Sequence, residues 1–359
     1  MSQHSSYTRT AIICAAASPK TGYGKVMSCL GLSLALSREN YRSVFLLPQT
    51  DAEIRNEFER RGQLIRELID ESNLEQDLYQ LQELFEEYDS DLLIVDSSLA
   101  SPLFLKKVAN LGVATVVFDD HAQRDYPCDL ILNPYGYSTP QSYPSRRAGQ
   151  LLLGPDYAPL REEFLAAREM CGSLKEKVEV VMVTLGVTDP DNQTDKVLTA
   201  LEDCPGVDII LLVVGIGFPH RKAVLERLKN YRKPVIPFFG VADMAQIMLS
   251  SDMAISASGI TCYELACLGI PTITLVLNEK QRRNAEELAK RGVTLDLGRA
   301  QDLTPQELRK AVQALISNPE KRKMMSEIGK KMVDGQGGKR AADKIAELTR
   351  KVKLTKIDF

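Results

Sequence analysis

The sequence predicts an α/β protein built from two doubly wound, Rossmann-like domains with a ligand-binding cleft between them. The chain has 359 residues, which exceeds the usual size of one hydrophobic core. Short apolar runs alternate with longer segments of helical spacing, as in a parallel sheet covered by helices. This alternation stops in a stretch rich in proline, serine and tyrosine at 133–147 and then starts again, which indicates two domains.

The first predicted domain covers residues 1–155. Its strands are expected at the apolar runs 11–16, 43–47, 92–95, 115–118 and 130–132. Its helices are expected where apolar residues recur at helical spacing, at 26–38, 53–67, 74–88 and 104–110. The stretch 133–147 is predicted to be a long loop at which the domain ends.

The second predicted domain covers residues 156–359, and its terminal helix is a candidate to pack back on the first domain. Its strands are expected at 178–185, 209–214, 235–237, 253–256, 272–277 and 293–297. The chain from Pro305 onward is expected to be helical, with Pro319 in the first turn of a further helix. Doubly wound sheets bind ligands beyond the carboxyl ends of their strands, so polar residues that follow strands are the candidates for a site.

Composition excludes several classes of function. Apolar residues at 44% and charged residues at 26% are typical of a soluble globular protein, and a net charge of −3 does not suit nucleic acid, which needs a basic face. Residues 1–10 lack the layout of a signal peptide, and the longest apolar stretch, 209–218, is too short to span a bilayer. We expect a cytoplasmic protein that binds a small molecule, without nucleic acid or stable membrane insertion, and the oligomeric state stays open.

The sequence also predicts no metal and no cofactor. The seven cysteines include no C-x-x-C pair and lie mostly in apolar segments, so we expect reduced, buried thiols. The three histidines are scattered, and none lies at ligand spacing from a cysteine. No G-x-G-x-x-G follows the first strand, and the residues around Lys25 do not match a P-loop, so neither a dinucleotide nor ATP hydrolysis is indicated.

The strongest motif is SASGITCYELACLGIP at Ser256–Pro271, which follows a predicted strand. It is typical of a serine- and glycine-containing turn, a helix that ends at glycine, and a proline that enters the next strand. We expect Ser258 to cap the helix and Gly259 to let a ligand approach the backbone. The free N–H groups of the first turn, near Ile260 and Thr261, would then bind an anionic diphosphate. A capped helix that binds nothing explains these residues alone about equally well.

Three side chains near this turn extend the motif. Glu264 could accept hydrogen bonds from a ribose diol, and the helix that opens at Asn278–Ala285 brings Gln281 and Asn284 toward the same edge. The string SGITCYELACLGIP followed by QxxNA resembles the donor-binding region of GT-B enzymes related to the N-acetylglucosaminyltransferase of peptidoglycan synthesis. This resemblance implies a GT-B fold in which Glu264 binds the ribose and the turn binds the diphosphate of a nucleotide sugar.

The rest of the chain resembles the UDP-sugar hydrolases of the pseudaminic acid pathway and the similar spore-coat polysaccharide biosynthesis proteins. The matching stretches span most of residues 11–340 and are 118–120, 128–133, 154–164, 186–192, 242–244 and 333–335. The resemblance implies that UDP leaves the anomeric carbon and that water takes its place, which releases a free diacetamido-trideoxy sugar.

The turn after the first strand departs from that family. Those hydrolases carry G-x-G-H there, with a histidine implicated in catalysis, whereas this chain has Gly22-Tyr23-Gly24-Lys25. The arginine three residues later is Ser28, and the aspartate-histidine-tyrosine run after a later strand is Asp96-Ser97-Ser98. A lysine acts as a base only if its pKa falls by several units, whereas a charged lysine suits phosphate. We expect Lys25 to contact phosphate together with Gly22 and Gly24, and a solvated lysine at a helix start is the alternative.

Other candidate groups also follow predicted strands. In the first domain these are Asp96, Asp119, Asp120 and His121, of which His121 is the best alternative base because imidazole titrates near neutral pH. Asp119 and Asp120 more often serve as turn and helix-cap residues. The catalytic candidates are therefore Lys25, Asp96 and His121.

In the second domain, Gly186, Thr188 and Asp189 follow the first strand and are expected to contact phosphate or sugar. Capping of the helix near 192–201 is the alternative for Thr188 and Asp189.

Three functions are compatible with these features. The favoured one is a nucleotide-sugar hydrolase-like enzyme of bacterial surface polysaccharide or nonulosonic acid biosynthesis, which cleaves at the anomeric carbon of a UDP-sugar. A GT-B glycosyltransferase would use the same donor pocket but deliver the sugar to an acceptor hydroxyl. A non-catalytic nucleotide-sugar-binding homologue would keep that pocket and lack the chemistry around Lys25. The sugar, the nucleotide and the acceptor stay open.

Overall fold

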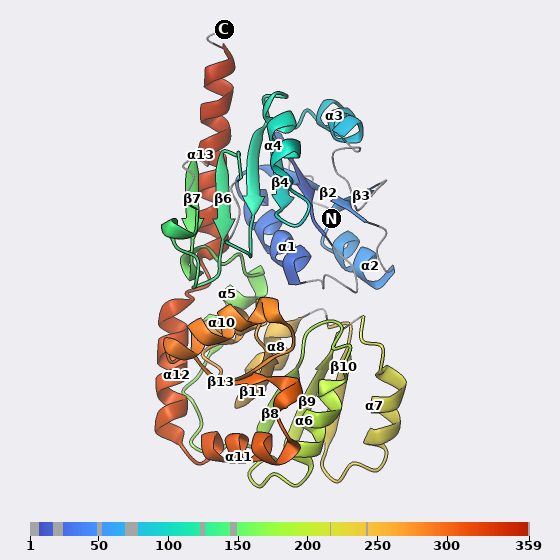
Figure 1. Ribbon diagram of the computed structural model, residues 1–359, viewed down its shortest axis with the longest axis vertical. Helices are drawn as coiled ribbons and strands as arrows, with labels where there is room; N and C mark the ends of the chain where they lie inside the picture. The colour runs from blue at the N-terminus through green and yellow to red at the C-terminus, as the bar shows by residue number, and fades with distance from the viewer. Residues whose placement is uncertain are drawn as a thin grey trace. The chain divides into compact units, whose positions relative to one another are not determined.

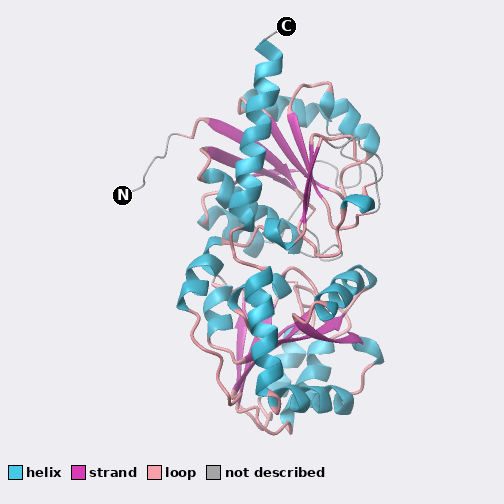
Figure 2. Ribbon diagram, turned by 90° about the vertical axis from the view of Figure 1, so that its left-hand side faces the viewer, coloured by secondary structure: helices cyan, strands magenta, loops and turns pink. Residues whose placement is uncertain are grey.

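The computed structural model describes residues 7–16, 24–48, 52–68, 78–122, 126–143, 149–215, 217–241 and 243–357. It divides into two compact units, of which unit 1 comprises Met1–Glu162 with Gln336–Phe359 and unit 2 comprises Glu163–Gly335. Unit 1 therefore contains two separate stretches of the chain, because helix α13 (Gly337–Ile357) returns to it (Figure 1). Each unit has helices on both sides of a sheet, as Figure 2 shows.

Unit 1 is built on a seven-stranded parallel sheet with the order β3-β2-β1-β4-β5-β6-β7. The chain moves outward from β1 to β3 and then returns to the other side of β1, so the strand order reverses between β1 and β4. Such a reversal separates the flanking helices and leaves a crevice at the carboxyl ends of the two strands. The strands are β1 (Arg9–Cys14), β2 (Tyr41–Leu47), β3 (Leu64–Glu67), β4 (Leu92–Asp96), β5 (Ala114–Phe118), β6 (Leu130–Asn133) and β7 (Gln150–Leu153).

The helices of unit 1 cover both faces of this sheet. Helices α1 and α13 pack against each other, while α3 and α4 bury apolar side chains in one core with residues of β1, β2, β4, β5 and β6. The central strands β1, β4 and β5 are almost wholly buried, as expected for a parallel sheet between two helical layers. The helices are α1 (Gly24–Ser37), α2 (Ala52–Arg60), α3 (Leu78–Glu87), α4 (Pro102–Ala109) and α13, with short helical turns η1 (Pro140–Ser142) and η2 (Pro155–Tyr157).

Unit 2 repeats this plan with a six-stranded parallel sheet in the order β10-β9-β8-β11-β12-β13. Here the strand order reverses between β8 and β11. The strands are β8 (Val180–Thr184), β9 (Ile209–Val214), β10 (Val235–Phe239), β11 (Met253–Ala257), β12 (Thr272–Val276) and β13 (Thr294–Arg299). The helices are α5 (Glu162–Met170), α6 (Gln193–Glu202), α7 (Arg221–Leu228), α8 (Met244–Leu249), α9 (Thr261–Leu268), α10 (Glu279–Lys290), α11 (Pro305–Ile316) and α12 (Pro319–Met332), with the turn η3 (Ala300–Asp302).

Two expectations for the first domain are wrong in detail. The helix expected at 53–67 ends at Arg60, because Gly62 adopts a left-handed φ of 71° and the following residues form edge strand β3. The long loop at 133–147 is followed by strand β7, which the pattern missed since it has only four residues and one is fully buried. The part of the expected helix 74–88 before Leu78 lies outside the described residues.

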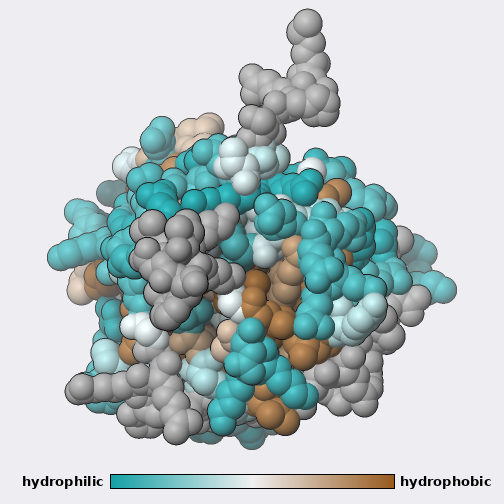
Figure 3. Space-filling model, turned by 90° about the horizontal axis from the view of Figure 1, so that it is seen from above, coloured by the Kyte–Doolittle hydropathy of each residue, from teal (hydrophilic) through white to brown (hydrophobic). Residues whose placement is uncertain are grey.

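On the face drawn in Figure 3, hydrophilic side chains predominate, and a group of hydrophobic side chains is exposed near the middle of the view. Within the described residues, no helix combines the length and apolar character required to cross a bilayer. In the same part of the chain, no group of three or more acidic, histidine or cysteine side chains is arranged to hold a metal ion. All seven cysteines are free thiols, and only Cys171 is partly exposed.

Candidate functional site

The two turns singled out in the second domain lie at one edge of the unit 2 sheet. Strands β8 and β11 are hydrogen-bonded neighbours, and the turn 186–189 follows β8 while the turn 258–261 follows β11. The two turns therefore flank the reversal of strand order. This is the position at which doubly wound sheets bind ligands.

The turn after β8 depends on two glycines. Gly186 is exposed and adopts a φ of 82°, and nothing lies within 4 Å of the place a Cβ would take. Gly215, after β9, lets the backbone of Val187 pack directly against it. A Cβ at position 215 would lie only 2.2 Å from the Val187 Cα, so no larger residue fits without a shift of the backbone. The turn is thus fixed against the end of β9 and open at Gly186.

Asp189 caps helix α6. Its carboxylate is 3% exposed and accepts hydrogen bonds from the N–H groups of Gln193 and Thr194, both at 2.8 Å, and from the Thr194 hydroxyl at 2.7 Å. These bonds use both oxygens, so the geometry favours capping over ligand contact for this residue. Thr188, beside it, is half-buried.

The turn after β11 leads into the N-terminus of α9. Its N-cap is Ile260, and the Ser258 hydroxyl makes no cap hydrogen bond, so the expectation that Ser258 caps the helix is wrong. The backbone N–H groups of Ile260 and Thr261 donate no hydrogen bond to any residue that the structure describes. No atom lies within 4 Å of a Cβ built on Gly259. This helix end therefore presents unpaired donors beside open space, which suits an anion.

The side chain of Asn284 connects the turn 258–261 to helix α9 by hydrogen bonds. Asn284 is 1% exposed, and its amide donates to the Ser258 carbonyl oxygen at 3.3 Å while its Oδ1 accepts from the Tyr263 hydroxyl at 2.8 Å. Gln281 similarly accepts the Leu277 N–H at 2.9 Å through its Oε1. Both amides, expected near the ligand, are thus bonded to the protein, and Asn284 holds the turn in place.

Glu264 is the acidic residue of the first turn of α9 and is 7% exposed. It lies five positions after Gly259, so it is at the same end of α9 as the turn 258–261. The described part of unit 2 therefore gathers Gly186, Thr188, the turn 258–261 and Glu264 at one sheet edge.

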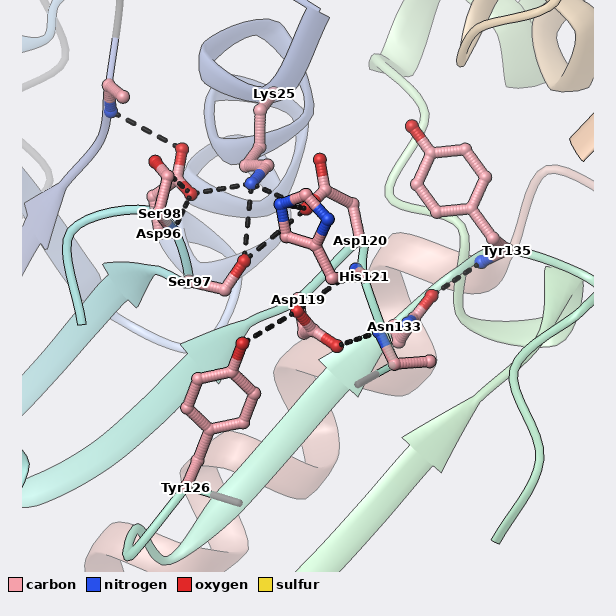
Figure 4. Close-up of polar contacts among 12 residues, drawn as sticks. Lys25, Asp96, Ser97, Ser98, Asp119, Asp120, His121, Tyr126, Asn133 and Tyr135 are labelled. Carbon is pink, nitrogen blue, oxygen red and sulfur yellow. Dashed lines mark hydrogen bonds and ion pairs between the residues drawn. The ribbon is translucent and has the colours of Figure 1, made fainter. Parts of the chain in front are cut away.

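A charged cluster occupies the corresponding edge of unit 1, at the carboxyl ends of β4 and β5 (Figure 4). The Lys25 Nζ, on the first turn of α1, lies 2.6 Å from Asp96 Oδ1 and 2.9 Å from Asp120 Oδ1. The Ser97 Oγ lies 3.4 Å from both Lys25 Nζ and Asp120 Oδ1, and His121 Nε2 lies 3.3 Å from Asp120 Oδ1. The three catalytic candidates therefore lie in one cluster, in which Lys25 bridges Asp96 and Asp120, and His121 contacts Asp120.

Asp96 anchors this cluster. It is 1% exposed, and Ser98 donates to its Oδ1 from the N–H at 2.8 Å and from the hydroxyl at 2.9 Å, while the Ala16 N–H reaches Oδ2 at 3.4 Å. Burial alone would lower the pKa of Lys25. The carboxylates of Asp96 and Asp120 together raise it by more than burial lowers it, so the pKa of Lys25 lies above its ordinary value. Lys25 stays charged and already has two anionic partners, which makes it a poor base and a weaker phosphate ligand than the sequence alone indicates.

Asp119 is a structural residue of the loop that carries His121. It is fully buried and accepts hydrogen bonds from the hydroxyls of Tyr143 at 2.7 Å and Tyr126 at 3.1 Å, and from the N–H groups of His121 and Ala122. Burial raises the pKa of Asp119, but these hydrogen bonds lower it more, so the net pKa lies below its usual value. The bonds fix the direction in which the loop leaves β5.

Sequence reasoning missed Ser97 and the central place of Asp120. Both follow strands, as the chosen candidates do, but only the pairing of β4 with β5 shows that the two residues meet. Gly22 lies outside the described residues. Gly24 begins α1, and its carbonyl oxygen accepts the Ser28 hydroxyl at 3.1 Å.

Comparison with known proteins agrees with this architecture. Residues 180–340 match the model of the glycosyltransferase family 28 C-terminal domain. The spore coat polysaccharide biosynthesis protein SpsG of Bacillus subtilis (strain 168) is 31% identical over 253 residues, which cover 69% of this chain and 74% of that protein.

Solved structures show the same fold. MurG of Acinetobacter baumannii superposes with a TM-score of 0.66 at 15% identity, over 94% of this chain and 99% of MurG. UDP-GlcNAc 2-epimerase from Neisseria meningitidis, bound to UDP-GlcNAc, superposes with a TM-score of 0.65 at 14% identity, over 94% of this chain and all of the epimerase (100%).

The fold and the family match define a glycosyltransferase-like enzyme with the GT-B fold and two Rossmann-like domains, which confirms the predicted fold class. Within this class, the chain belongs to the family of the spore coat polysaccharide biosynthesis protein SpsG.

Proposed function

We propose that the chain is a glycosyltransferase of polysaccharide biosynthesis that takes its sugar from a UDP-sugar. The observation that carries this proposal is the N-terminus of α9, where the N–H groups of Ile260 and Thr261 are unpaired beside the open space at Gly259. A diphosphate carries the negative charge that such a helix end favours. Gly186 offers a second open backbone position at the same sheet edge, and Glu264 supplies a carboxylate for the ribose hydroxyls.

The choice of transfer over hydrolysis rests on two considerations. The match to a glycosyltransferase family and the GT-B relatives support transfer at least as well as the hydrolysis that the resemblance in sequence favoured. Lys25, which stands where those hydrolases carry a histidine, is held in its charged form and cannot take a proton from water. We assign donor binding to the second domain, residues 156–359, and acceptor binding and catalysis to the first, residues 1–155.

Donor binding can be tested with a substitution that changes only the open space. Gly259→Ala places a methyl group where the structure has no neighbouring atom, so we expect an unchanged melting temperature. The methyl group would occupy the space of the diphosphate, and UDP binding measured by calorimetry should weaken at least tenfold, or about 1.4 kcal/mol.

Gly172→Ala is the matched control. Gly172 also has no atom within 4 Å of a Cβ, but it lies after α5 and outside both turns, so its variant should keep the melting temperature and the UDP affinity. Equal UDP binding by the Gly259→Ala and wild-type proteins would contradict the proposed diphosphate site.

The reaction itself is tested by incubating the protein with UDP-glucose, UDP-N-acetylglucosamine and a UDP-linked diacetamido-trideoxy sugar, with and without carbohydrate acceptors. We expect UDP to be released only when an acceptor is present. Release of UDP and free sugar without an acceptor would instead identify a hydrolase, and binding without release would identify a non-catalytic protein.

A further inference from the structure

The turn after β8 has an unfavourable backbone conformation. Gly186 adopts a φ of 82°, and Asp189 and Asn192, which are not glycines, adopt φ values of 36° and 50°. The left-handed region is costly for a residue with a Cβ. Such conformations persist only where the surrounding structure enforces them, and they gather at binding sites. The contacts that enforce this turn therefore bear on the donor site that it borders.

Two of these contacts hold the turn through Asp189 and Val187. The Asp189 carboxylate accepts hydrogen bonds from the first turn of α6, and the backbone of Val187 packs against Gly215, which follows β9. Neither contact involves Pro190, which is exposed. The segment between Asp189 and Asn192 needs a further restraint to keep its conformation.

His220 supplies that restraint. Its Nε2 lies 2.8 Å from the carbonyl oxygen of Pro190. Because a carbonyl oxygen only accepts hydrogen bonds, Nε2 carries the hydrogen and donates it. The bond joins residues that are 30 positions apart and connects the turn after β8 to the start of α7.

The position of His220 shows that its ring does not serve its own helix. His220 is the N-cap residue of α7, yet its side chain makes no capping hydrogen bond. Serine, threonine, aspartate and asparagine are the usual N-cap residues, because their side-chain oxygens accept a backbone N–H. The His220 ring lies instead edge-to-face with the buried Phe218, with ring centroids 5.5 Å apart and an interplanar angle of 71°. Helix α7 and Phe218 thus fix the ring beside the Pro190 carbonyl.

We propose that His220 is a positioning residue of the donor site, whose hydrogen bond to the Pro190 carbonyl holds the turn 186–192 in the conformation that receives the diphosphate. This inference rests on the proposed function, since the role requires a UDP-sugar at this edge of unit 2. His220 acts through the turn and need not touch the ligand. Without the bond the turn adopts other conformations as well, and the apparent affinity falls with the fraction that keeps the binding conformation.

The binding test compares two replacements of His220. His220→Phe keeps an aromatic ring beside Phe218 but removes the donor, so we expect UDP binding measured by calorimetry to weaken about fivefold, as for the loss of one hydrogen bond. His220→Gln introduces an amide that donates to the same carbonyl. Its affinity for UDP should return to within about twofold of the wild-type value, which separates the role of the donor from that of the ring.

Tyr231→Phe is the matched control. The Tyr231 hydroxyl donates to the Leu198 carbonyl oxygen at 2.6 Å, so this variant also gains a phenylalanine and loses one donor to a backbone carbonyl of unit 2. Leu198 lies within α6, outside the turn 186–192. Tyr231→Phe should lower the melting temperature at least as much as His220→Phe does, yet keep the wild-type affinity for UDP.

A second measurement needs no ligand. Amide hydrogen exchange of the free protein, followed by mass spectrometry, reports how often a segment opens. In His220→Phe, peptides that cover 186–192 should exchange faster than in the wild type, while peptides of β11 should not change. Tyr231→Phe should leave the exchange of 186–192 at the wild-type rate.

The outcomes distinguish the two proposals. If UDP does not bind the wild-type protein, the proposed function fails. If UDP binds the wild type and His220→Phe equally well, the role of His220 is overturned and the donor site stands. The role is also overturned if His220→Gln binds UDP as weakly as His220→Phe, or if exchange of 186–192 is the same in His220→Phe and the wild type.

Discussion

Replacement of Asp189 tests whether this residue caps helix α6 or binds a ligand. In Asp189→Ala the helix loses its cap, which is worth about 1 kcal/mol, and buried donors lose a charged acceptor, which costs about 1.5–3 kcal/mol. Asp189 also has a φ of 36°, and an alanine in that region costs roughly 1 kcal/mol. We expect unit 2 to lose about 3 kcal/mol in its free energy of unfolding, because the three penalties partly overlap.

The assay is thermal unfolding, monitored by scanning calorimetry. A loss of this size lowers the melting temperature of a unit the size of Glu163–Gly335 by roughly 6–12 °C. Asp189→Asn should lose about half as much, since asparagine keeps one acceptor oxygen and tolerates a positive φ. Asp191→Ala, at an exposed neighbour, should change stability by no more than about 0.5 kcal/mol. The capping role is refuted if Asp189→Asn keeps the wild-type melting temperature but no longer binds UDP.

Three further substitutions test the supporting structure. Arg322 is fully buried and donates to carbonyl groups at the end of α11, so Arg322→Met should cost about 3 kcal/mol in urea unfolding, because those carbonyls lose a charged donor. Folding lowers the pKa of Asp119, so its ionised carboxylate stabilises the folded protein fully above the unfolded pKa of about 3.9. This stabilisation is lost as pH falls through the folded pKa. The difference in unfolding free energy between Asp119→Asn and wild type should therefore shrink in acid. Gly215→Ala would drive a methyl group into Val187, and urea unfolding should show a loss of at least about 1 kcal/mol together with weaker UDP binding.

Local sequence patterns predicted most of the secondary structure. The alternation of buried apolar runs with amphipathic segments gave the main strands of both units, because a parallel sheet covered on both faces requires continuous apolar strands. The turn before α9 was recognisable because serine, glycine and a following helix are adjacent in the chain. The edge strands β3 and β7 were missed, since β3 has no fully buried residue and β7 has one, so each run is short and its burial gives little apolar signal.

The partners of the polar residues could not be predicted in the same way. Lys25 and Asp96 are separated by 71 positions, and Tyr263 and Asn284 by 21 positions, so no local pattern relates them. Their contacts depend on which strands are neighbours, and that order follows from how whole strands and helices pack.

The sequence by itself determined two doubly wound domains and the glycine turns at which a nucleotide sugar is expected to bind, because these features depend on residues close together in the chain. Three contacts could be learned only from the tertiary structure. The charged Lys25 forms ion pairs with two carboxylates, Asn284 hydrogen-bonds to the Ser258 backbone, and His121 contacts Asp120. The physical reason is that a side chain's charge state and hydrogen bonds are set by the groups within a few ångströms of it, and the strand order brings those groups from distant parts of the chain.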